Sequence, residues 1–284
     1  SRARRGGNFY KQSRYRRVYM KLYEMMDLNG QTALITGAAG HIGKVISDTF
    51  LELGCAVILV DRDRLKLEEY KNKNLKKEDK IHIIGCDFED EDFLKVIYDY
   101  VKKNCPKLDI LINNAAFVGD SEIDGWTVKF EDQSIDTWRR AIEVNLTASF
   151  SLTQKLVNFL MHENNGRVIN ISSMYGFIGP YMKLYEGTSM GSPVAYSVSK
   201  GGLTQLTRWL STTLGPNVRV NTISPGGIER GQSNKFKDKY IERVPLNRLG
   251  SERDLIGAVL FLGSNMSKYV TGQDIVVDGG YSVI

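Results

Sequence analysis

The stretch Thr36-Gly37-Ala38-Ala39-Gly40-His41-Ile42-Gly43 stands between a short apolar run, Thr32–Thr36, and a stretch of helical period over residues 42–53. Glycines at such a junction permit a tight turn and let backbone N–H groups approach a bound group closely. The N-terminus of the following helix stabilises negative charge, which suits a pyrophosphate. Because turns use glycine in any case, the surroundings of this stretch decide what it means.

The next apolar run, Ala56–Val60, ends directly before Asp61. A carboxylate at the end of a second strand accepts hydrogen bonds from an adenosine ribose and repels a 2′-phosphate. The glycine-rich turn and Asp61 together predict a dinucleotide site that prefers NAD to NADP, although the adjacent Arg62 keeps NADP open. The alternative is a solvated aspartate that opens the turn Asp61-Arg62-Asp63-Arg64.

Short apolar runs alternate with longer helical segments along the chain, which is typical of a parallel sheet with helices on both faces. The expected strands are Thr32–Thr36, Ala56–Val60, Ile81–Gly85, Ile110–Asn113, Arg167–Ile171, Val218–Ile223 and Asp274–Val277. The expected helices are 42–53, 64–77, 91–103, 135–162, 194–214 and 252–263. This order predicts a single α/β domain with a doubly wound, Rossmann-like parallel sheet of about seven strands.

Three irregular stretches, 117–134, 174–193 and 224–249, follow expected strands at their carboxyl ends. Ligands of open α/β sheets bind at that edge, so we expect the first two stretches to line a substrate crevice and the third to form a lid. The third stretch is rich in charge, which is either a phosphate site or a solvated face. Its charged residues are Arg230, Lys235, Lys237, Lys239, Arg243 and Arg248, with Glu229, Asp238 and Glu242.

Tyr196 and Lys200 are four residues apart and therefore share one face of the expected helix 194–214. A phenol with a pKa of about 10 must be shifted by roughly 3 units, or about 4 kcal/mol, to act as a base near neutral pH. An ammonium about 4.5 Å away supplies roughly 3.7 kcal/mol at an effective dielectric constant near 20. Such a pair is also common on helix surfaces, and alone it would carry no functional meaning.

Two further polar residues accompany this pair. Ser173 follows the expected strand Arg167–Ile171, and Asn145 lies in the long helical segment before it. A serine hydroxyl can orient a carbonyl or an alcohol, and an asparagine can hold a water that relays protons. With the glycine-rich turn, these residues give the chain from Asp27 to Ile284 a resemblance to the single-domain short-chain dehydrogenase/reductase superfamily.

The resemblance implies an NAD(P)-dependent oxidoreductase that acts on CH–OH groups. It implies a catalytic tetrad of Asn145, Ser173, Tyr196 and Lys200. It implies a cofactor site formed by Gly37, Ala39, Gly40, His41, Ile42, Gly43, Asp61, Arg62, Asp87, Phe88, Asn114, Ala115, Ala116, Tyr196, Lys200, Pro225, Gly226 and Ile228. The carboxyl-terminal motif from Tyr269 to Gly280 also matches, and in the family this end often makes tetramer contacts, so we expect a homodimer or homotetramer.

The sequence departs from the family pattern at three places. His41 stands where single-domain members usually have glycine, and the glycine at position 40 gives a spacing closer to the extended, nucleotide-sugar branch. Arg230 stands where many members have a threonine that touches the cofactor. The segment from Ser173 to Tyr196 is longer than the family norm by one loop.

That longer segment gives a clue to the substrate. The run Tyr185-Glu186-Gly187-Thr188 resembles oxidoreductases of flagellin or surface-glycan sugar modification. We therefore expect hydride transfer between NAD and a carbinol carbon of a sugar, sugar phosphate or nucleotide sugar. One alternative is a nucleotide-sugar epimerase or dehydratase that uses NAD internally, and another is a non-catalytic, NAD-sensing protein.

Charge and composition exclude other classes. Residues 1–24 carry a net charge of +7, while the whole chain of 284 residues carries +5, so the remainder is close to neutral. We interpret residues 1–24 as a basic arm, disordered or artificially appended, and residues 25–284 as the domain, with no nucleic-acid site. The spacing of the three cysteines and three histidines predicts no disulfide framework and no metal site. No apolar run reaches membrane-spanning length, and we expect a cytoplasmic protein without a membrane partner.

Overall fold

The computed structural model describes residues 22–118 and 123–284. Its strands are β1 Thr32–Thr36, β2 Ala56–Asp61, β3 Ile81–Gly85, β4 Ile110–Asn113, β5 Gly166–Ile171, β6 Val218–Pro225 and β7 Asp274–Val277. Its α-helices in these ranges are α1 Leu22–Met26, α2 His41–Glu52, α3 Arg64–Lys73, α4 Phe93–Asn104, α5 Ile135–Ile142, α6 Ala148–Leu160, α7 Val194–Leu214, α8 Asn234–Ile241 and α9 Ile256–Gly263. None of them is long and apolar enough to span a membrane.

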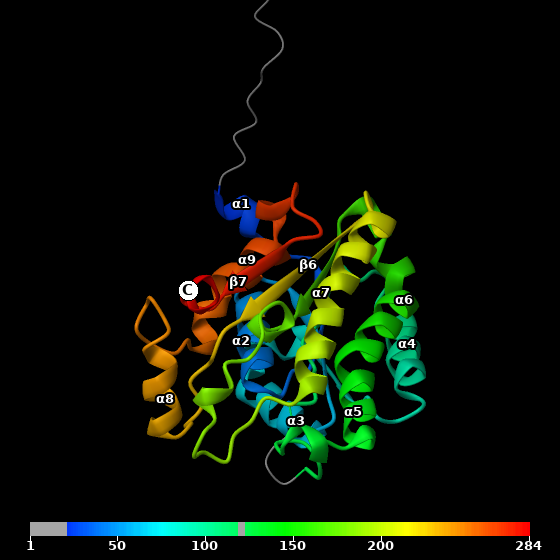
Figure 1. The fold of residues 1–284 in the computed structure, drawn as a ribbon. Coiled ribbons are helices and arrows are strands. Elements are labelled where there is room, and N and C mark those ends of the chain that lie inside the picture. Colours follow the sequence, from blue (N-terminus) through cyan, green and yellow to red (C-terminus); the bar gives the residue numbers. More distant parts are fainter. Residues whose placement is uncertain (1–21, 119–122) are drawn as a thin grey trace, which may run out of the picture.

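The strands form one parallel sheet in the order β3-β2-β1-β4-β5-β6-β7. The order reverses beside β1, where the chain crosses from β3 to β4, and the predicted doubly wound, Rossmann-like sheet is confirmed. Figure 1 shows the sheet with α7, α6 and α4 together on one side. In an open sheet of this order, ligands bind at the carboxyl ends of the strands next to the reversal.

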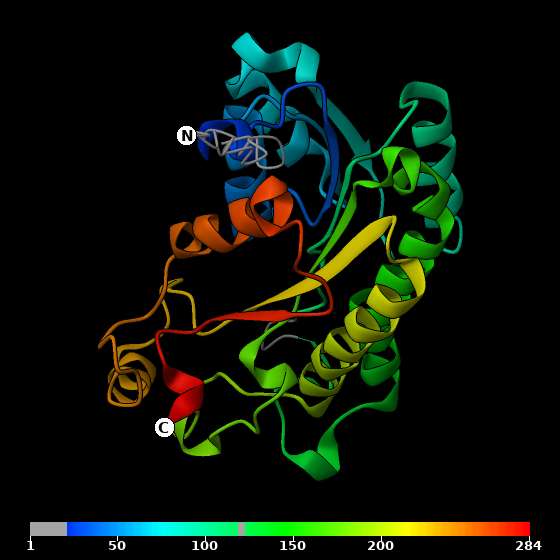
Figure 2. The same ribbon diagram turned by 90° about the horizontal axis from the view of Figure 1, so that it is seen from above.

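The core consists of two layers, one on each face of the sheet. Leu34 of β1 belongs to the layer that contains buried residues of α4, α6 and α7, whereas its neighbour Ile35 belongs to the layer of α2, α3 and α9. Successive side chains of a strand point to opposite faces, so a strand buried on both sides is apolar throughout. Figure 2 shows the sheet between these two layers of helices.

Several element bounds differ from the prediction. The expected helix 135–162 is divided into α5 and α6 by a π-helical turn, Glu143–Thr147. The expected helix 252–263 begins as a 3-10 turn, Glu252–Leu255, before α9. In the lid, α8 was not predicted, because its sequence is charged and shows little apolar period. Of the expected arm, residues 1–21 lie outside the described residues, and α1 crosses the expected border between residues 24 and 25.

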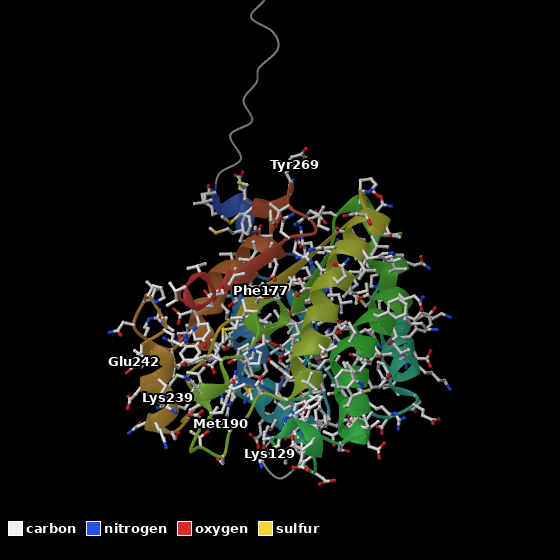
Figure 3. The ribbon with its side chains drawn as sticks, in the orientation of Figure 1. Lys129, Phe177, Met190, Lys239, Glu242 and Tyr269 are labelled. Carbon is white, nitrogen blue, oxygen red and sulfur yellow. The ribbon has the colours of Figure 1, made fainter. Side chains whose placement is uncertain are left out.

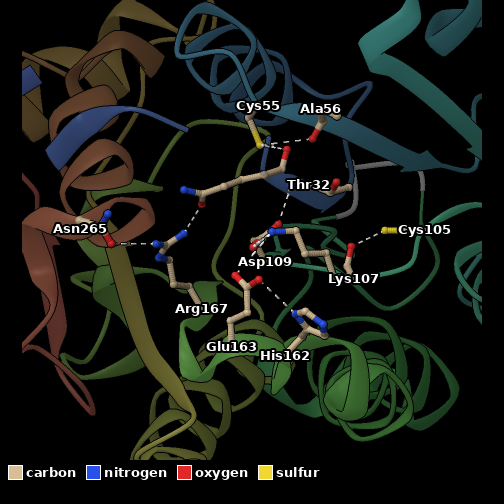
Figure 4. A network of polar contacts seen from close by, with 11 residues as sticks. Thr32, Cys55, Ala56, Cys105, Lys107, Asp109, His162, Glu163, Arg167 and Asn265 are labelled. Carbon is tan, nitrogen blue, oxygen red and sulfur yellow. Dashed lines mark hydrogen bonds and ion pairs between the residues drawn. The ribbon is translucent and has the colours of Figure 1, made fainter. Parts of the chain in front are cut away.

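The amino-terminal edge of the sheet is closed by buried polar contacts. Arg167 at the start of β5 is 1% exposed and donates hydrogen bonds to Gln31 and, over 3.1 Å, to Oδ1 of Asn265. Nearby, Oδ2 of Asp109 accepts a hydrogen bond of 2.8 Å from the backbone N–H of Thr32 (Figure 4). These contacts fix the strand starts.

A third, smaller core joins the irregular stretch 174–193, expected at the crevice, to the stretch 224–249, expected as a lid. It contains Leu184 of the 174–193 insertion, Phe236 and Tyr240 of α8, and Tyr281 near the carboxyl end. The ring centroids of Tyr240 and Tyr281 are 4.8 Å apart in a stacked arrangement. The insertion, the lid and the last turn therefore pack as one unit beside the sheet.

Candidate active site

The glycine-rich turn packs closely against the end of β4. Gly37 has φ +63°, and a Cβ at this position would lie 2.7 Å from Cα of Ala115. A Cβ on Gly43 would lie 2.3 Å from the carbonyl oxygen of Gly37. Gly40 precedes α2, whose N-terminus has no side-chain cap in the described part of the chain. The first N–H groups of α2 are thus available to an anion.

Asn114 holds the turn against β4. Its Nδ2 donates hydrogen bonds to the carbonyl oxygens of Thr36, 2.8 Å away, and Gly37, 3.0 Å away. The backbone N–H groups of Asn114 and Ala115 both donate to Oγ1 of Thr36 over 3.0 Å. The side chain of Asn114 therefore holds the glycine-rich turn in place.

Asp61 ends β2 and is joined to the same turn. Its Oδ2 accepts a hydrogen bond from the N–H of Ala39, and its Oδ1 accepts one from the N–H of Asp63, each over 3.0 Å. A cavity of about 320 Å³ opens beside Asp61. The predicted cofactor residues that line it are Gly37, Asp61, Arg62, Asp87, Phe88, Ala115 and Ala116.

Sequence reasoning missed an ion pair at the rim of this cavity, between Arg140 and Glu89, which we call the clasp. Nη2 of Arg140 on α5 lies 3.1 Å from Oε2 of Glu89, and its Nε binds the other carboxylate oxygen. The guanidinium carbon of Arg140 is 5.0 Å from the ring centroid of Phe117, which also lines the cavity. The two ends of the clasp are 51 residues apart and follow no motif, so the sequence offered no signal for it.

Asn145 lies inside the π-helical turn between α5 and α6 and is fully buried. Its Oδ1 accepts a hydrogen bond of 2.6 Å from the N–H of Phe117. Its Nδ2 donates to the carbonyl oxygen of Phe117 over 3.3 Å and to Oγ of Ser199 over 2.9 Å. These contacts use both amide hydrogens. The side chain therefore connects the segment after β4, the π turn and α7. That Asn145 also holds a proton-relay water stays a prediction.

The structure brings Ser173, Tyr196 and Lys200 together at the carboxyl end of β5. Ser173 lies close enough to the Tyr196 phenol to lower its pKa, and its Oγ accepts a 3.2 Å hydrogen bond from the N–H of Tyr175. Lys200 is 2% exposed, and its Nζ donates a 2.8 Å hydrogen bond to the carbonyl oxygen of Ile171. The same Nζ lies 5.9 Å from the centroid of the Tyr196 ring.

The electrostatics of this group differ from the sequence-based expectation. Burial raises the pKa of Tyr196, while the hydrogen bond to Ser173 and the positive charge of Arg230 lower it. Burial lowers the pKa of Lys200 to about 8. Arg230 is thus a second cation that acts on the phenol, beside Lys200, which is poorly solvated and bound to a backbone carbonyl.

The predicted loop after β6 borders the same region. Pro225 ends β6, and the N–H of Gly226 donates a 2.9 Å hydrogen bond to the carbonyl oxygen of Val277. The N–H of Gly227 donates to the phenol oxygen of Tyr240 over 2.6 Å, and Ile228 pairs with Gly250. These bonds hold the loop between β7 and α8.

Comparison with known proteins decides the family. A sequence profile described as Enoyl-(Acyl carrier protein) reductase matches residues 37–282, which is most of the chain. The chain is a short-chain dehydrogenase/reductase. It is accordingly an NAD(P)-dependent oxidoreductase that acts on CH–OH groups.

Curated members of this family match over nearly their whole length. The chain is 32% identical to a 3-oxoacyl-(acyl-carrier-protein) reductase of Thermotoga maritima over 90% of this chain and 99% of that protein. It is 30% identical to post-translational flagellin modification protein A of Campylobacter coli over 90% of this chain and 100% of that protein. A short-chain dehydrogenase structure from Leptospira borgpetersenii with bound NAD⁺ superposes with a TM-score of 0.77 at 31% identity, covering 90% and 94% of the two chains.

Two of the three departures from the family pattern meet at one carboxylate. Oε1 of Glu252 lies 3.2 Å from Nε of Arg230 and 3.8 Å from Nδ1 of His41. The side chain of Glu252 is 20% exposed, while that of His41 is 71% exposed. The residues that replace the usual threonine and glycine are thus connected through the 3-10 turn before α9.

The third departure, the longer segment before Tyr196, contacts α8. Nζ of Lys239 donates hydrogen bonds to the carbonyl oxygens of Lys183, 2.7 Å away, and Glu186, 3.2 Å away. Figure 3 labels Lys239 on α8 and Met190 on the neighbouring insertion. Within the insertion, the phenol oxygens of Tyr185 and Tyr175 are 2.7 Å apart, and burial raises the pKa of Tyr185. Tyr185 therefore packs against the third core, next to Phe236 of α8.

Proposed function

We propose that this chain transfers a hydride between NAD and a secondary alcohol or ketone on a sugar-like substrate, with Ser173, Tyr196 and Lys200 as catalytic residues. The observation that carries the proposal is that Ser173, Tyr196 and Lys200 come together at the carboxyl end of β5, with Nζ of Lys200 5.9 Å from the centroid of the Tyr196 ring. A serine hydroxyl and a phenol that lie side by side can both donate a hydrogen bond to one substrate oxygen. Asn145 supports them by its bonds to Phe117 and Ser199.

The residues present fit a dinucleotide. The Gly37 position leaves no room for a side chain, the N-terminus of α2 lacks a side-chain cap, and the 320 Å³ cavity lies beside Asp61. When bound, NAD would accept or supply the hydride. We propose the other predicted residues, Ala39, Gly40, His41, Ile42, Gly43, Asn114, Pro225, Gly226 and Ile228, as its further contacts or supports. The Asp61 carboxylate supports a preference for NAD, since it would repel a 2′-phosphate.

Proton transfer is assigned to Tyr196. Its raised pKa keeps the phenol protonated at neutral pH, so it is ready to donate a proton to a carbonyl oxygen during reduction. Ser173 orients that oxygen through its hydroxyl. In the direction of oxidation the same phenol must lose its proton, and the charges of Lys200 and Arg230 favour the phenolate. Lys200 would also bind the ribose next to the nicotinamide.

A sugar substrate is supported by the insertion and by one relative. The insertion contributes the phenol groups of Tyr175 and Tyr185, and aromatic and polar side chains together suit a ring with many hydroxyls. The relative from Campylobacter coli is named for flagellin modification. We propose a sugar, sugar phosphate or nucleotide sugar of surface-glycan synthesis as the substrate. We place the reaction in the cytoplasm, where the three free thiols would stay reduced.

We propose that the protein forms a homodimer or a homotetramer. Large apolar side chains are exposed on α6 and α7, including Phe150 at 39%, Val198 at 46% and Trp209 at 58%. Exposed apolar residues on neighbouring helices favour burial against another subunit. Sedimentation equilibrium of the wild type and of Trp209→Glu tests this, with a monomeric wild type as the contradicting result.

The test of the proposed function is a screen of sugars, sugar phosphates and nucleotide sugars with NAD, followed by NADH absorbance. Tyr196→Phe should lose about 10²- to 10⁴-fold in turnover. Its NADH affinity, measured by fluorescence, should stay within about twofold, since no proton is exchanged on binding. Turnover without net NADH release would instead identify an epimerase or dehydratase. Near-normal activity of Tyr196→Phe would disprove the assignment.

A further inference from the structure

Arg230 is held at the catalytic edge by its own loop. It follows β6 after the loop that ends at Ile228, and its backbone N–H donates a 2.7 Å hydrogen bond to Oε1 of Gln232. Nε2 of Gln232 in turn donates a 2.7 Å hydrogen bond to the carbonyl oxygen of Ile228. The backbone from which the guanidinium projects is therefore fixed in a closed turn.

The guanidinium itself is only partly used. Its Nε binds Glu252 over 3.2 Å, and no residue within 22–118 and 123–284 hydrogen-bonds its two Nη groups. The side chain is 37% exposed. An arginine presents its N–H groups in a planar fork that matches a carboxylate or a phosphate. Two donor groups of this fork thus remain open to a ligand.

Three neighbouring cations of the lid are already engaged. Lys237 pairs with Glu229 over 2.7 Å, and Lys239 donates to backbone carbonyl groups of the insertion. Arg248 forms a two-point ion pair with Asp254. Arg230 differs from these three, because its Nη groups have no partner within the described residues and its positive charge lowers the pKa of Tyr196.

We propose that Arg230 binds an anionic group of the substrate, a carboxylate or a phosphate, while Ser173 and Tyr196 engage the reacting oxygen. This inference rests on the proposed function and narrows its substrate class to anionic sugars. Glu252 keeps the guanidinium in place before the substrate binds and limits its attraction for simple anions. A threonine, which many family members have at this position, offers a single hydroxyl and cannot make a two-point contact with an anion.

The binding test uses the complex with NADH, so that the pyrophosphate site at α2 is filled. Malonate and inorganic phosphate are the anionic probes, glycerol is the neutral probe, and NADH fluorescence is the readout. Saturable binding of an anion should weaken by about 10- to 100-fold in Arg230→Gln, which corresponds to the loss of a charged hydrogen bond. Arg230→Lys should recover part of the loss. The matched control, Lys237→Gln, removes a cation of the same lid and should bind as the wild type does.

The turnover test uses substrate pairs that differ only in charge. The pairs are gluconate with glucitol and glucose 6-phosphate with glucose, and the comparison of the two anions distinguishes a carboxylate from a phosphate. We expect the preferred anion to lose its advantage in Arg230→Gln mainly through a higher KM. Equal anion binding by Arg230→Gln and the wild type overturns the inference, as does a wild type that prefers the neutral partners.

Failure of this inference is distinguishable from failure of the proposed function. If Tyr196→Phe abolishes turnover while Arg230→Gln binds and oxidises anions normally, only the role of Arg230 is wrong. If Arg230→Gln loses anion binding while Tyr196→Phe remains active, the anion site stands and the catalytic assignment falls.

Discussion

Nζ of Lys200 donates a 2.8 Å hydrogen bond to the carbonyl oxygen of Ile171, so the ammonium is tied to the end of β5. Ile171 directly precedes Ser172 and Ser173, and the Ser172 hydroxyl donates a 2.9 Å hydrogen bond back to the carbonyl oxygen of Lys200. The helix that carries Tyr196 is therefore fastened to the strand that carries Ser173 by two bonds in opposite directions. This fixes the distance between the two proposed catalytic oxygens.

The buried Lys200 makes stability depend on pH. Burial lowers its pKa to about 8 in the folded protein, below its usual 10.5, so the unfolded chain holds more protons between these values. The contribution of Lys200 to stability therefore rises as the pH increases from about 8 to 10.5, by up to about 3 kcal/mol. Urea unfolding of the wild type and of Lys200→Met across this range measures the difference. A difference that stays constant or shrinks would contradict the expected sign.

Asp61 should determine the coenzyme preference. Asp61→Ala removes the acceptor expected for the ribose and the repulsion of a 2′-phosphate, so NAD affinity should fall about 10-fold and NADP affinity should rise. Titrations of NADH and NADPH by fluorescence give the ratio. Asp63→Ala, two residues further on, is the matched control. It removes the N-cap of α3, where Asp63 accepts a hydrogen bond from Lys66, and should leave the ratio unchanged.

Asn145 should matter for stability as well as for turnover. Asn145→Ala leaves the backbone groups of Phe117 and the hydroxyl of Ser199 without their buried partner, and we expect a loss of about 2–4 kcal/mol in the free energy of unfolding. Asn158→Ala on the exposed side of α6 provides the control and should change stability little. A stable but inactive Asn145→Ala would show that the residue acts in chemistry alone.

Lys239 should keep the insertion on α8. Lys239→Met removes the hydrogen bonds to the carbonyl oxygens of Lys183 and Glu186, so amide hydrogen exchange over residues 183–188 should become faster. We expect a higher KM at a similar kcat, because the wall near Tyr185 becomes less ordered. Lys268→Met, which changes a lysine remote from this contact, serves as the control. Unchanged exchange in Lys239→Met would mean that the aromatic packing alone holds the insertion.

Much of the fold and of the site followed from the sequence because its signals are local. The strand ends at Thr36, Gly85 and Asn113 were predicted from apolar runs bounded by polar residues or glycine. The cavity beside Asp61 gathers residues that each belong to a short motif. Such motifs are recognisable in a single sequence because each one meets a local requirement of the backbone, such as a tight turn.

What the sequence did not reveal depends on contacts between distant residues. The π turn at Glu143–Thr147 keeps the apolar period of a helix, so periodicity alone cannot detect it. The clasp of Arg140 with Glu89 joins two elements that only the folded sheet brings together. The sequence also did not reveal how far burial raises the pKa of Tyr196 and lowers that of Lys200, because burial depends on the packing of distant segments.

The stacked rings of Tyr240 and Tyr281 lie in the small core that joins the 174–193 insertion, α8 and the final turn. A chimera that received the 174–193 loop of a relative, without its α8 and its final turn, would expose an unmatched aromatic surface. Exchange of selectivity within this family should therefore succeed when these three pieces are transplanted jointly. Grafts of a single loop should instead yield insoluble or unselective enzymes.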